Sequence, residues 1–257
     1  MPVKTDLGLA GAVVLVTGGV RGVGKGITAV FLAQGAHVVT CARREAATEA
    51  EFVRCDVRDE EQVSALVGGI VARHGRLDVV VNNAGGAPYV SAADASPRLH
   101  EKVVQLNLLA PLLVAQHANA VMQRQAAGGS IVMISSVSGT RPSPGTAAYG
   151  AAKAGLDSLA ASLAVEWAPK VRVNALDVGM VRTEQSHLHY GSEAAVEAVG
   201  KTVPLGRLAE PEEVGACAAF LASPLASYVS GATLRVHGGG EVPAFLAAAD
   251  VNHREDS

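Results

Sequence analysis

The chain has few charges for its length and no run of either sign. Of its 257 residues, 18% are Asp, Glu, Lys or Arg, against a typical ~25%, and the formal net charge is −3. Proteins that bind nucleic acid or an anionic membrane surface normally carry a basic patch, so the sequence predicts neither partner. The shortage of charge also indicates that part of the surface is buried against other subunits.

Cysteines and long apolar runs are scarce as well. The three cysteines are scattered and lack C-x-x-C spacing, which predicts buried thiols in a reducing compartment. No apolar run reaches the ~18 residues that span a bilayer. The stretch after Lys4 superficially mimics a signal peptide, but Asp6 interrupts it and it leads into a glycine-rich turn. We therefore expect a cytoplasmic protein.

Short apolar segments alternate with helical patterns along the chain, which is typical of an α/β fold with a parallel sheet. The sequence shows no repeat or linker, so residues 1–257 are predicted to form a single domain, with 241–257 as a C-terminal tail. Within the tail, we expect 243–248 to pack against a neighbour and 252–257 to be disordered. We expect a short loop at 44–49, and strands at 13–16, 37–41, 51–55, 78–81, 130–134, 172–176 and 233–237.

A glycine-rich turn follows the first predicted strand. It reads Thr17-Gly18-Gly19-Val20-Arg21-Gly22-Val23-Gly24 and leads into a helical pattern at 25–34. The free amides and the positive end of the helix dipole at such a junction favour an anion such as a pyrophosphate. The spacing is not G-x-G-x-x-G. A P-loop, matched over 19–25, is disfavoured because Gly26 stands where a Ser or Thr would bind magnesium.

Tyr149 and Lys153 lie four residues apart, and Tyr149 is 13 positions after Ser136. On a helix, the Tyr and Lys would share a face. A phenol titrates near pH ~10, and a neighbouring ammonium favours its anion, so Lys153 could activate Tyr149 as an acid/base. Ser136 could hold the substrate oxygen while Tyr149 exchanges the proton. The alternative is a chance Tyr/Lys pair on a solvated helix.

Together, these motifs resemble those of the short-chain dehydrogenase/reductase family in its single-domain form. The resemblance covers nearly the whole chain and includes Asn82-Asn83-Ala84-Gly85 and Asn107 in a long apolar helix. It implies a Rossmann-type, doubly wound parallel sheet of about seven strands with helices on both faces. It also implies hydride transfer between a nicotinamide cofactor and a ketone or secondary alcohol.

The resemblance assigns roles to individual residues. Lys153 would lower the pKa of Tyr149 and hold the ribose, and Ser136 would polarise the carbonyl group. Asn107 would hold a water in a proton relay; an ordinary helical Asn bonded to its own backbone is the alternative. The predicted catalytic residues are thus Asn107, Ser136, Tyr149 and Lys153. The predicted cofactor contacts are Tyr149 and Lys153 together with Thr17, Gly18, Arg21, Gly22, Val23, Gly24, Arg43, Asp56, Val57, Asn83, Ala84, Gly85, Gly179, Val181 and Thr183.

The end of the second predicted strand bears on the choice of cofactor. An enzyme for NAD commonly places Asp or Glu there to accept the ribose hydroxyls. This chain reads Thr40-Cys41-Ala42-Arg43-Arg44, with no acid and an arginine suited to a 2′-phosphate. In NADP-using relatives, an arginine at the position of Arg21 often approaches the same phosphate, so NADP is expected over NAD. The alternative is that Arg43 and Arg44 are solvated loop charges.

One position departs from the family pattern, and one segment is distinctive. Val178 stands where relatives usually carry proline, so the backbone there is less restricted. Residues 184–202 are expected to cover the substrate. Their His187, His189 and Tyr190 could contact substrate or lie on the surface. No zinc-site pattern surrounds them, so no metal is expected.

The substrate and the assembly are less defined. The resemblance is strongest to 3-oxoacyl thioester reductases, so a CoA or carrier-protein thioester is a candidate, with Arg124, Lys170 and Arg172 as docking cations. An NAD-dependent secondary-alcohol or steroid dehydrogenase is the alternative. A non-catalytic cofactor-sensing protein would usually lose the Tyr or the Lys, and a serine hydrolase would need G-x-S-x-G. Helical segments 99–122 and 151–168 are apolar around much of their circumference, and we expect a homotetramer, as relatives form.

Overall fold

Runs of apolar and β-branched residues form a parallel sheet that is covered on both faces. The computed structural model describes residues 6–248, in which seven strands lie in the order β3-β2-β1-β4-β5-β6-β7. All predicted strands are present, with ends within two residues of those expected. Their bounds are β1 Val13–Thr17, β2 His37–Ala42, β3 Glu51–Arg54, β4 Val79–Asn82, β5 Gly129–Ile134, β6 Val171–Val178 and β7 Thr233–Val236.

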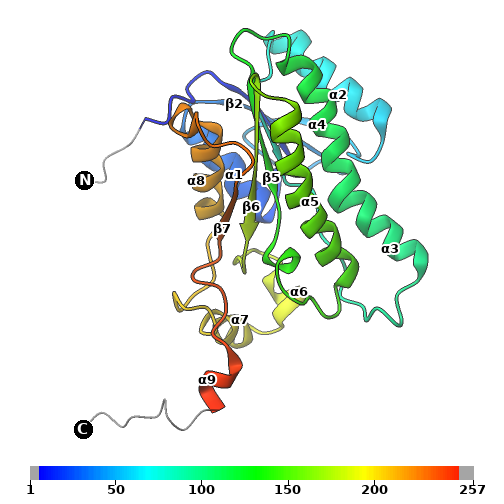
Figure 1. The fold of residues 1–257 in the computed structure, drawn as a ribbon, viewed down its shortest axis with the longest axis vertical. Helices are drawn as coiled ribbons and strands as arrows, with labels where there is room; N and C mark the ends of the chain where they lie inside the picture. The colour runs from blue at the N-terminus through cyan, green and yellow to red at the C-terminus, as the bar shows by residue number, and fades with distance from the viewer. Residues whose placement is uncertain (1–5, 249–257) are drawn as a thin grey trace.

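Helices connect all successive strands except β2 and β3, and they form a layer on each face of the sheet. Figure 1 shows α1 and α8 on one side and α2, α4 and α5 on the other, with α6 and α7 beyond one end of the sheet. The predicted doubly wound, Rossmann-type fold is confirmed. The helices are α1 Gly22–Ala33, α2 Glu60–His74, α3 Pro97–Val104, α4 Ala110–Met122, α5 Ala147–Glu166, α6 Ser186–Tyr190, α7 Glu193–Gly200, α8 Pro211–Ala222 and α9 Ala244–Ala248.

Alternate residues of each strand contribute to two separate apolar cores. Val16 of β1 packs in one core with Phe31 of α1, whereas its neighbour Leu15 packs in the other with Met122 of α4 and Leu156 of α5. Successive side chains of a strand point to opposite faces, so a sheet with helices on both sides needs apolar residues at every position. This requirement explains why the central strands β1, β4 and β5 were visible in the sequence as nearly continuous apolar runs.

One connection matches the predicted pattern, and two helical segments differ from it. Residues 44–49 form the expected loop between β2 and β3. Helix α1 begins at Gly22 rather than at residue 25, because the glycine turn itself forms the first helical residues. The segment 99–122 is interrupted by a π-helical turn, η1 (Gln105–Leu109), between α3 and α4.

Strand β6 continues two residues beyond its expected end. Asp177 and Val178 pair in register with Arg235 and Val236 of β7. Valine has the backbone N–H that proline lacks, so the position can belong to an interior strand. The departure from the family pattern therefore coincides with a longer β6.

The described part of the predicted tail runs from Glu241 through α9. Glu241 forms an ion pair with Arg141 at 2.7 Å. The expected disorder at 252–257 lies outside the described residues, and a single domain over 1–257 stays a prediction. Among residues 6–248, no helix combines the length and apolar character needed to cross a membrane.

Candidate active site

The predicted site residues lie near the carboxyl ends of the central strands. Thr17 ends β1, Asn83 follows β4 and Ser136 follows β5, while Tyr149 and Lys153 lie in α5. Because β1 and β4 are neighbours whose chains leave in opposite directions, a crevice opens between their carboxyl ends. The fold thus brings together residues that are more than a hundred positions apart in sequence.

Hydrogen bonds between Thr17 and the loop after β4 join the two sides of this crevice. The Oγ1 of Thr17 accepts the backbone N–H groups of Asn83 and Ala84, each at 3.0 Å. In return, Nδ2 of Asn83 donates to the carbonyl oxygens of Thr17 at 2.9 Å and Gly18 at 3.2 Å. The glycine turn is thereby held against the loop after β4.

The glycines of the turn are required by this close packing. Gly18 has a φ of 66°, in the left-handed region that favours glycine. A Cβ on Gly24 would lie 2.3 Å from the Gly18 carbonyl oxygen and 2.4 Å from Nδ2 of Asn83. Neither contact is tolerable, so substitution at Gly24 must open the turn.

The start of α1 already holds an anionic group of the protein itself. The backbone N–H of Gly22 donates to both carboxylate oxygens of Glu184, at 3.0 and 3.3 Å. Thr183 lies next to the same glycine, with its Cγ2 3.6 Å from where a Gly22 Cβ would be. A carboxylate at the positive end of a 12-residue helix shows that this position suits an anion such as a cofactor phosphate.

Of the serines after β5, Ser136 is the one beside Tyr149. The Ser135 hydroxyl donates to the Lys153 carbonyl oxygen at 3.2 Å, so it is turned toward the backbone of α5. The Ser136 hydroxyl accepts the Ser138 N–H at 3.2 Å. Burial raises the pKa of Tyr149 above its ordinary value, and a hydrogen bond with Ser136 opposes this shift.

Lys153 is buried close to the Tyr149 ring, yet the pKa of Tyr149 lies above its ordinary value rather than below it. Its Nζ donates to the Ile134 carbonyl oxygen at 2.7 Å and lies 5.6 Å from the centre of the Tyr149 ring. Burial lowers the pKa of Lys153 to about 8. The upward direction for Tyr149 follows from burial of the phenol, which is the largest influence on its pKa, and the lowering by Lys153 stays a prediction.

Asn107 connects the π-helical turn η1 to the loop after β4. Its Nδ2 donates to the carbonyl oxygens of Val103 at 2.9 Å and Gly86 at 3.0 Å, and its Oδ1 accepts the Gly86 N–H at 2.8 Å. A Cβ on Gly85 would lie 2.8 Å from Oδ1 of Asn107 and 3.6 Å from Nζ of Lys153. Asn107 therefore bonds to its own helix, as in the alternative reading, and also lies across Gly85 from Lys153.

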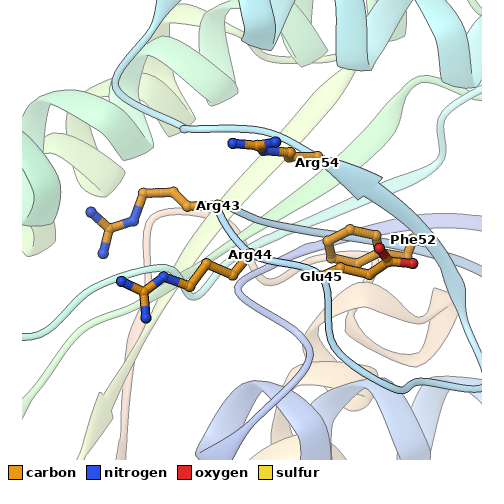
Figure 2. Close-up of a pocket in the computed structure, with 5 residues that line it drawn as sticks. All are labelled: Arg43, Arg44, Glu45, Phe52 and Arg54. Atoms are coloured by element: carbon orange, nitrogen blue, oxygen red, sulfur yellow. The ribbon is translucent and has the colours of Figure 1, made fainter.

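A basic pocket lies where β2 and β3 end (Figure 2). It has a volume of about 430 Å³ and is lined by Arg43, Arg44, Glu45, Phe52 and Arg54. Arg54 was missed in the sequence because it is an isolated arginine on a short strand; it is in register with Ala42 at the end of β2.

Asp56, one of the predicted cofactor contacts, follows β3 and is already paired. Its carboxylate accepts from Arg58 at 2.5 and 2.9 Å, and this hydrogen bonding lowers its pKa. The next residue, Val57, is 7% exposed and belongs to the core on the α2 side of the sheet. A carboxylate has about four acceptor sites, and Arg58 occupies two on Oδ1 and one on Oδ2, so Oδ2 can still accept from a ligand.

The segment after β6 supplies the remaining predicted contacts. Gly179 donates its N–H to the Val236 carbonyl at 2.9 Å, and Val181 forms a bridge with Ala209. His187 and His189 of α6 are exposed. Within residues 6–248, no cluster of three or more His, Cys, Asp or Glu side chains could hold a metal.

Comparisons with known proteins agree over most of the chain. The family model described as "Enoyl-(Acyl carrier protein) reductase" matches residues 18–241. "Dehydrogenase/reductase SDR family member 4" of Homo sapiens is 34% identical over 245 residues, which cover 90% of this chain and 88% of that protein. This protein belongs to the short-chain dehydrogenase/reductase family. The predicted family is confirmed, although 3-oxoacyl specificity is not part of that finding.

Two further relatives of this short-chain dehydrogenase/reductase have named activities. The cis-4-hydroxycyclohexanecarboxylate dehydrogenase of Sinomonas cyclohexanicum is 39% identical over 241 residues, covering 88% of this chain and 95% of that protein. The ligand-free aldohexose dehydrogenase of Thermoplasma acidophilum superposes with a TM-score of 0.87 at 30% identity, covering 91% and 96% of the two chains. The protein is an NAD(P)-dependent oxidoreductase that acts on alcohols and carbonyls, as predicted.

The Glu184 carboxylate at the start of α1 generates a prediction about cofactor affinity. A cofactor phosphate at this position must displace it, so Glu184→Gln is expected to bind NADPH about two- to fivefold more tightly, from a charge–dipole term of roughly 0.3–1 kcal/mol. Titration of NADPH fluorescence measures the change. Glu166→Gln, at the far end of α5, is the matched control and should leave the affinity unchanged. Equal affinity of Glu184→Gln and wild type would contradict the competition.

Proposed function

We propose that this short-chain dehydrogenase/reductase interconverts a ketone and a secondary alcohol with NADP(H), with Tyr149 as the proton donor and acceptor. The observation that carries the proposal is that the Ser136 hydroxyl lies beside Tyr149, whose ring is 5.6 Å from Nζ of the buried Lys153. A hydroxyl, a phenol and an ammonium at one crevice suit a reaction in which negative charge develops on a carbonyl oxygen.

Each side chain has a distinct task in the proposed reaction. The nicotinamide, when bound, supplies or accepts the hydride. Ser136 holds the substrate oxygen, and Tyr149 gives it a proton in the reductive direction. Because burial raises the pKa of Tyr149, the phenol carries its proton at neutral pH and is ready to donate it. Lys153, charged below about pH 8, stabilises the phenolate that remains.

Substitution of Tyr149 tests the catalytic assignment. Tyr149→Phe removes only the hydroxyl, so we expect turnover to fall at least about 100-fold, in keeping with the usual contribution of acid–base catalysis. NADPH binding should change little. The assay is a panel of small ketones, secondary alcohols and 3-oxoacyl-CoA thioesters with each cofactor.

Tyr228→Phe, at a fully exposed tyrosine, is the matched control and should behave as wild type. Retention of most activity by Tyr149→Phe would refute the mechanism. Cofactor binding by wild type without turnover of any substrate would instead favour the cofactor-sensing class.

The proposed preference for NADP rests on unpaired arginines. Within the described residues, Arg43, Arg44 and Arg54 form no ion pair with a carboxylate, although Glu45 lines the same pocket. Figure 2 shows the side chains of Arg43 and Arg44 extending in a similar direction from the end of β2. Guanidinium groups without acidic partners favour an anion, which supports a 2′-phosphate here.

The ratio of kcat/KM for NADPH to that for NADH tests this preference. A charge-assisted hydrogen bond is worth roughly 1.5–3 kcal/mol, so one effective arginine predicts about tenfold or greater preference for NADPH. The preference should shrink as salt rises. Ala42→Asp with Arg43→Ile should reverse it, whereas Arg124→Ile, in the loop before the amino end of β5, should not. Equal kcat/KM values for NADPH and NADH in the wild type would show that the arginines point to solvent.

We propose a small ketone or secondary alcohol rather than a carrier-protein thioester as the substrate. Arg172 donates to four backbone carbonyls at the end of α8 and beyond, and Lys170 donates to the Gln125 carbonyl at 2.8 Å. Two of the three predicted docking cations are therefore engaged within the protein. The names of the two relatives with stated activities also indicate small hydroxylated substrates.

The proposed homotetramer is supported by apolar residues at the open edge of the sheet. Leu234 of the edge strand β7 is 37% exposed, and Phe220 of the adjacent α8 is 39% exposed. An edge strand with exposed apolar residues is normally covered. We expect a tetrameric mass by light scattering at micromolar concentration, and a monomeric mass would contradict the proposal.

A further inference from the structure

Two acidic residues lie close to Lys153 on adjoining elements. Asp157 is four residues after Lys153 in α5 and therefore lies on the same side of that helix, one turn further along. Asp177 lies in β6, whose residues Val173 and Ala175 face the core that contains α5. Since Asp177 follows the same alternation, it faces α5 as well.

Three of the four carboxylate oxygens of this pair are enclosed and accept no hydrogen bond. Asp177 is 0% exposed, and within residues 6–248 neither of its Oδ atoms has a hydrogen-bond partner. The same holds for Oδ1 of Asp157. Burial of an ionised carboxylate without a partner is costly, so such a group either takes up a proton or is kept ionised by a nearby positive charge.

The charged and polar groups around the pair come from three elements. From α5, Lys153 is the nearby positive charge. From β7, Arg235 is in register with Asp177, but it is exposed and forms no ion pair among the described residues. Ser135, which follows β5, donates its hydroxyl to the Lys153 carbonyl and also lies within hydrogen-bonding reach of Asp157.

Asp157 and Lys153 influence each other in opposite directions. Burial raises the pKa of Asp157 to about 6, the neighbouring Asp177 adds to the rise, and attraction to Lys153 opposes it. Reciprocally, attraction to Asp157 raises the pKa of Lys153, which burial has lowered to about 8. Between about pH 6 and about pH 8, Asp157 is therefore ionised and Lys153 protonated.

We propose that Asp157 is the half-buried counter-charge that keeps Lys153 protonated at neutral pH, and that Asp177 adjusts the pH at which Asp157 becomes charged. Both are positioning residues, because they act on the reaction only through Lys153. The inference rests on the proposed role of Lys153 beside Tyr149. It adds two acids of β6 and α5 to the residues that determine the pH range of turnover.

The first test is the pH profile of ketone reduction by Asp157→Asn. Loss of the counter-charge lowers the pKa of Lys153, so the alkaline limb of kcat should move down by about one pH unit. At pH 8 this corresponds to a roughly fivefold fall in kcat, with KM changed less than about twofold. Asp94→Asn, at an exposed loop acid bonded to Ser91, is the matched control and should keep the wild-type profile. An unmoved alkaline limb in Asp157→Asn would overturn the proposal.

The second test observes the carboxyl groups without turnover. In the wild type, an infrared carbonyl band of a protonated carboxyl group should titrate near pH 6, where ordinary carboxyls with pKa values near ~4 are already ionised. The band should be absent in Asp157→Asn. It should move to lower pH in Asp177→Asn, because that substitution removes the like charge.

Absence of such a band in the wild type would also overturn the proposal, even if neither variant folds. The two levels of inference fail separately. If Tyr149→Phe stays active, the proposed role of Lys153 is refuted while the carboxyl titration persists. If Tyr149→Phe is inactive and no carboxyl group titrates, only the proposal for Asp157 and Asp177 is refuted.

Discussion

The hydrogen bonds between Thr17 and the loop after β4 hold the two halves of the sheet together at the point where strand order reverses. On one side of this joint the chain proceeds to β2 and β3, and on the other to β5, β6 and β7. The Thr17 hydroxyl accepts the backbone N–H groups of the two residues that follow β4. The glycine turn and Gly85 take their positions from these bonds, and Gly85 in turn separates Asn107 from Lys153.

The parts of the protein that the sequence predicted are those determined by local pattern. Parallel strands buried on both faces must be apolar at every position, so their places and ends could be read closely. The glycine turn was recognisable because its backbone has to pass within van der Waals contact of Asn83. Ser136 could be separated from Ser135 only through the family spacing, and the structure gives the reason: Ser135 is turned toward the backbone of α5.

What the sequence could not give depends on groups that meet only in the folded chain. Glu184 reaches Gly22 across 162 positions, and no local pattern marks either residue as a partner of the other. The direction of the pKa shift of Tyr149 could not be predicted from the presence of a lysine four residues away, because burial of the phenol is the largest influence on that pKa. The extension of β6 through Asp177 could likewise not be predicted. Asp is uncommon within strands and is seldom fully buried, whereas Asp177 is 0% exposed.

The π-helical turn η1 has a consequence for the relation between the two helices that it joins. A π turn accommodates one residue more than an α-helical turn, and each residue corresponds to about 100° of rotation about the helix axis. Gln105–Leu109 therefore sets the rotational phase of α3 relative to α4 as well as placing Asn107 against Gly86. Loss of a single residue there would hardly shorten the helix, but it would rotate all of α3 away from its present neighbours. The π turn therefore sets the rotation at which α4 packs into the core while Asn107 contacts the loop after β4.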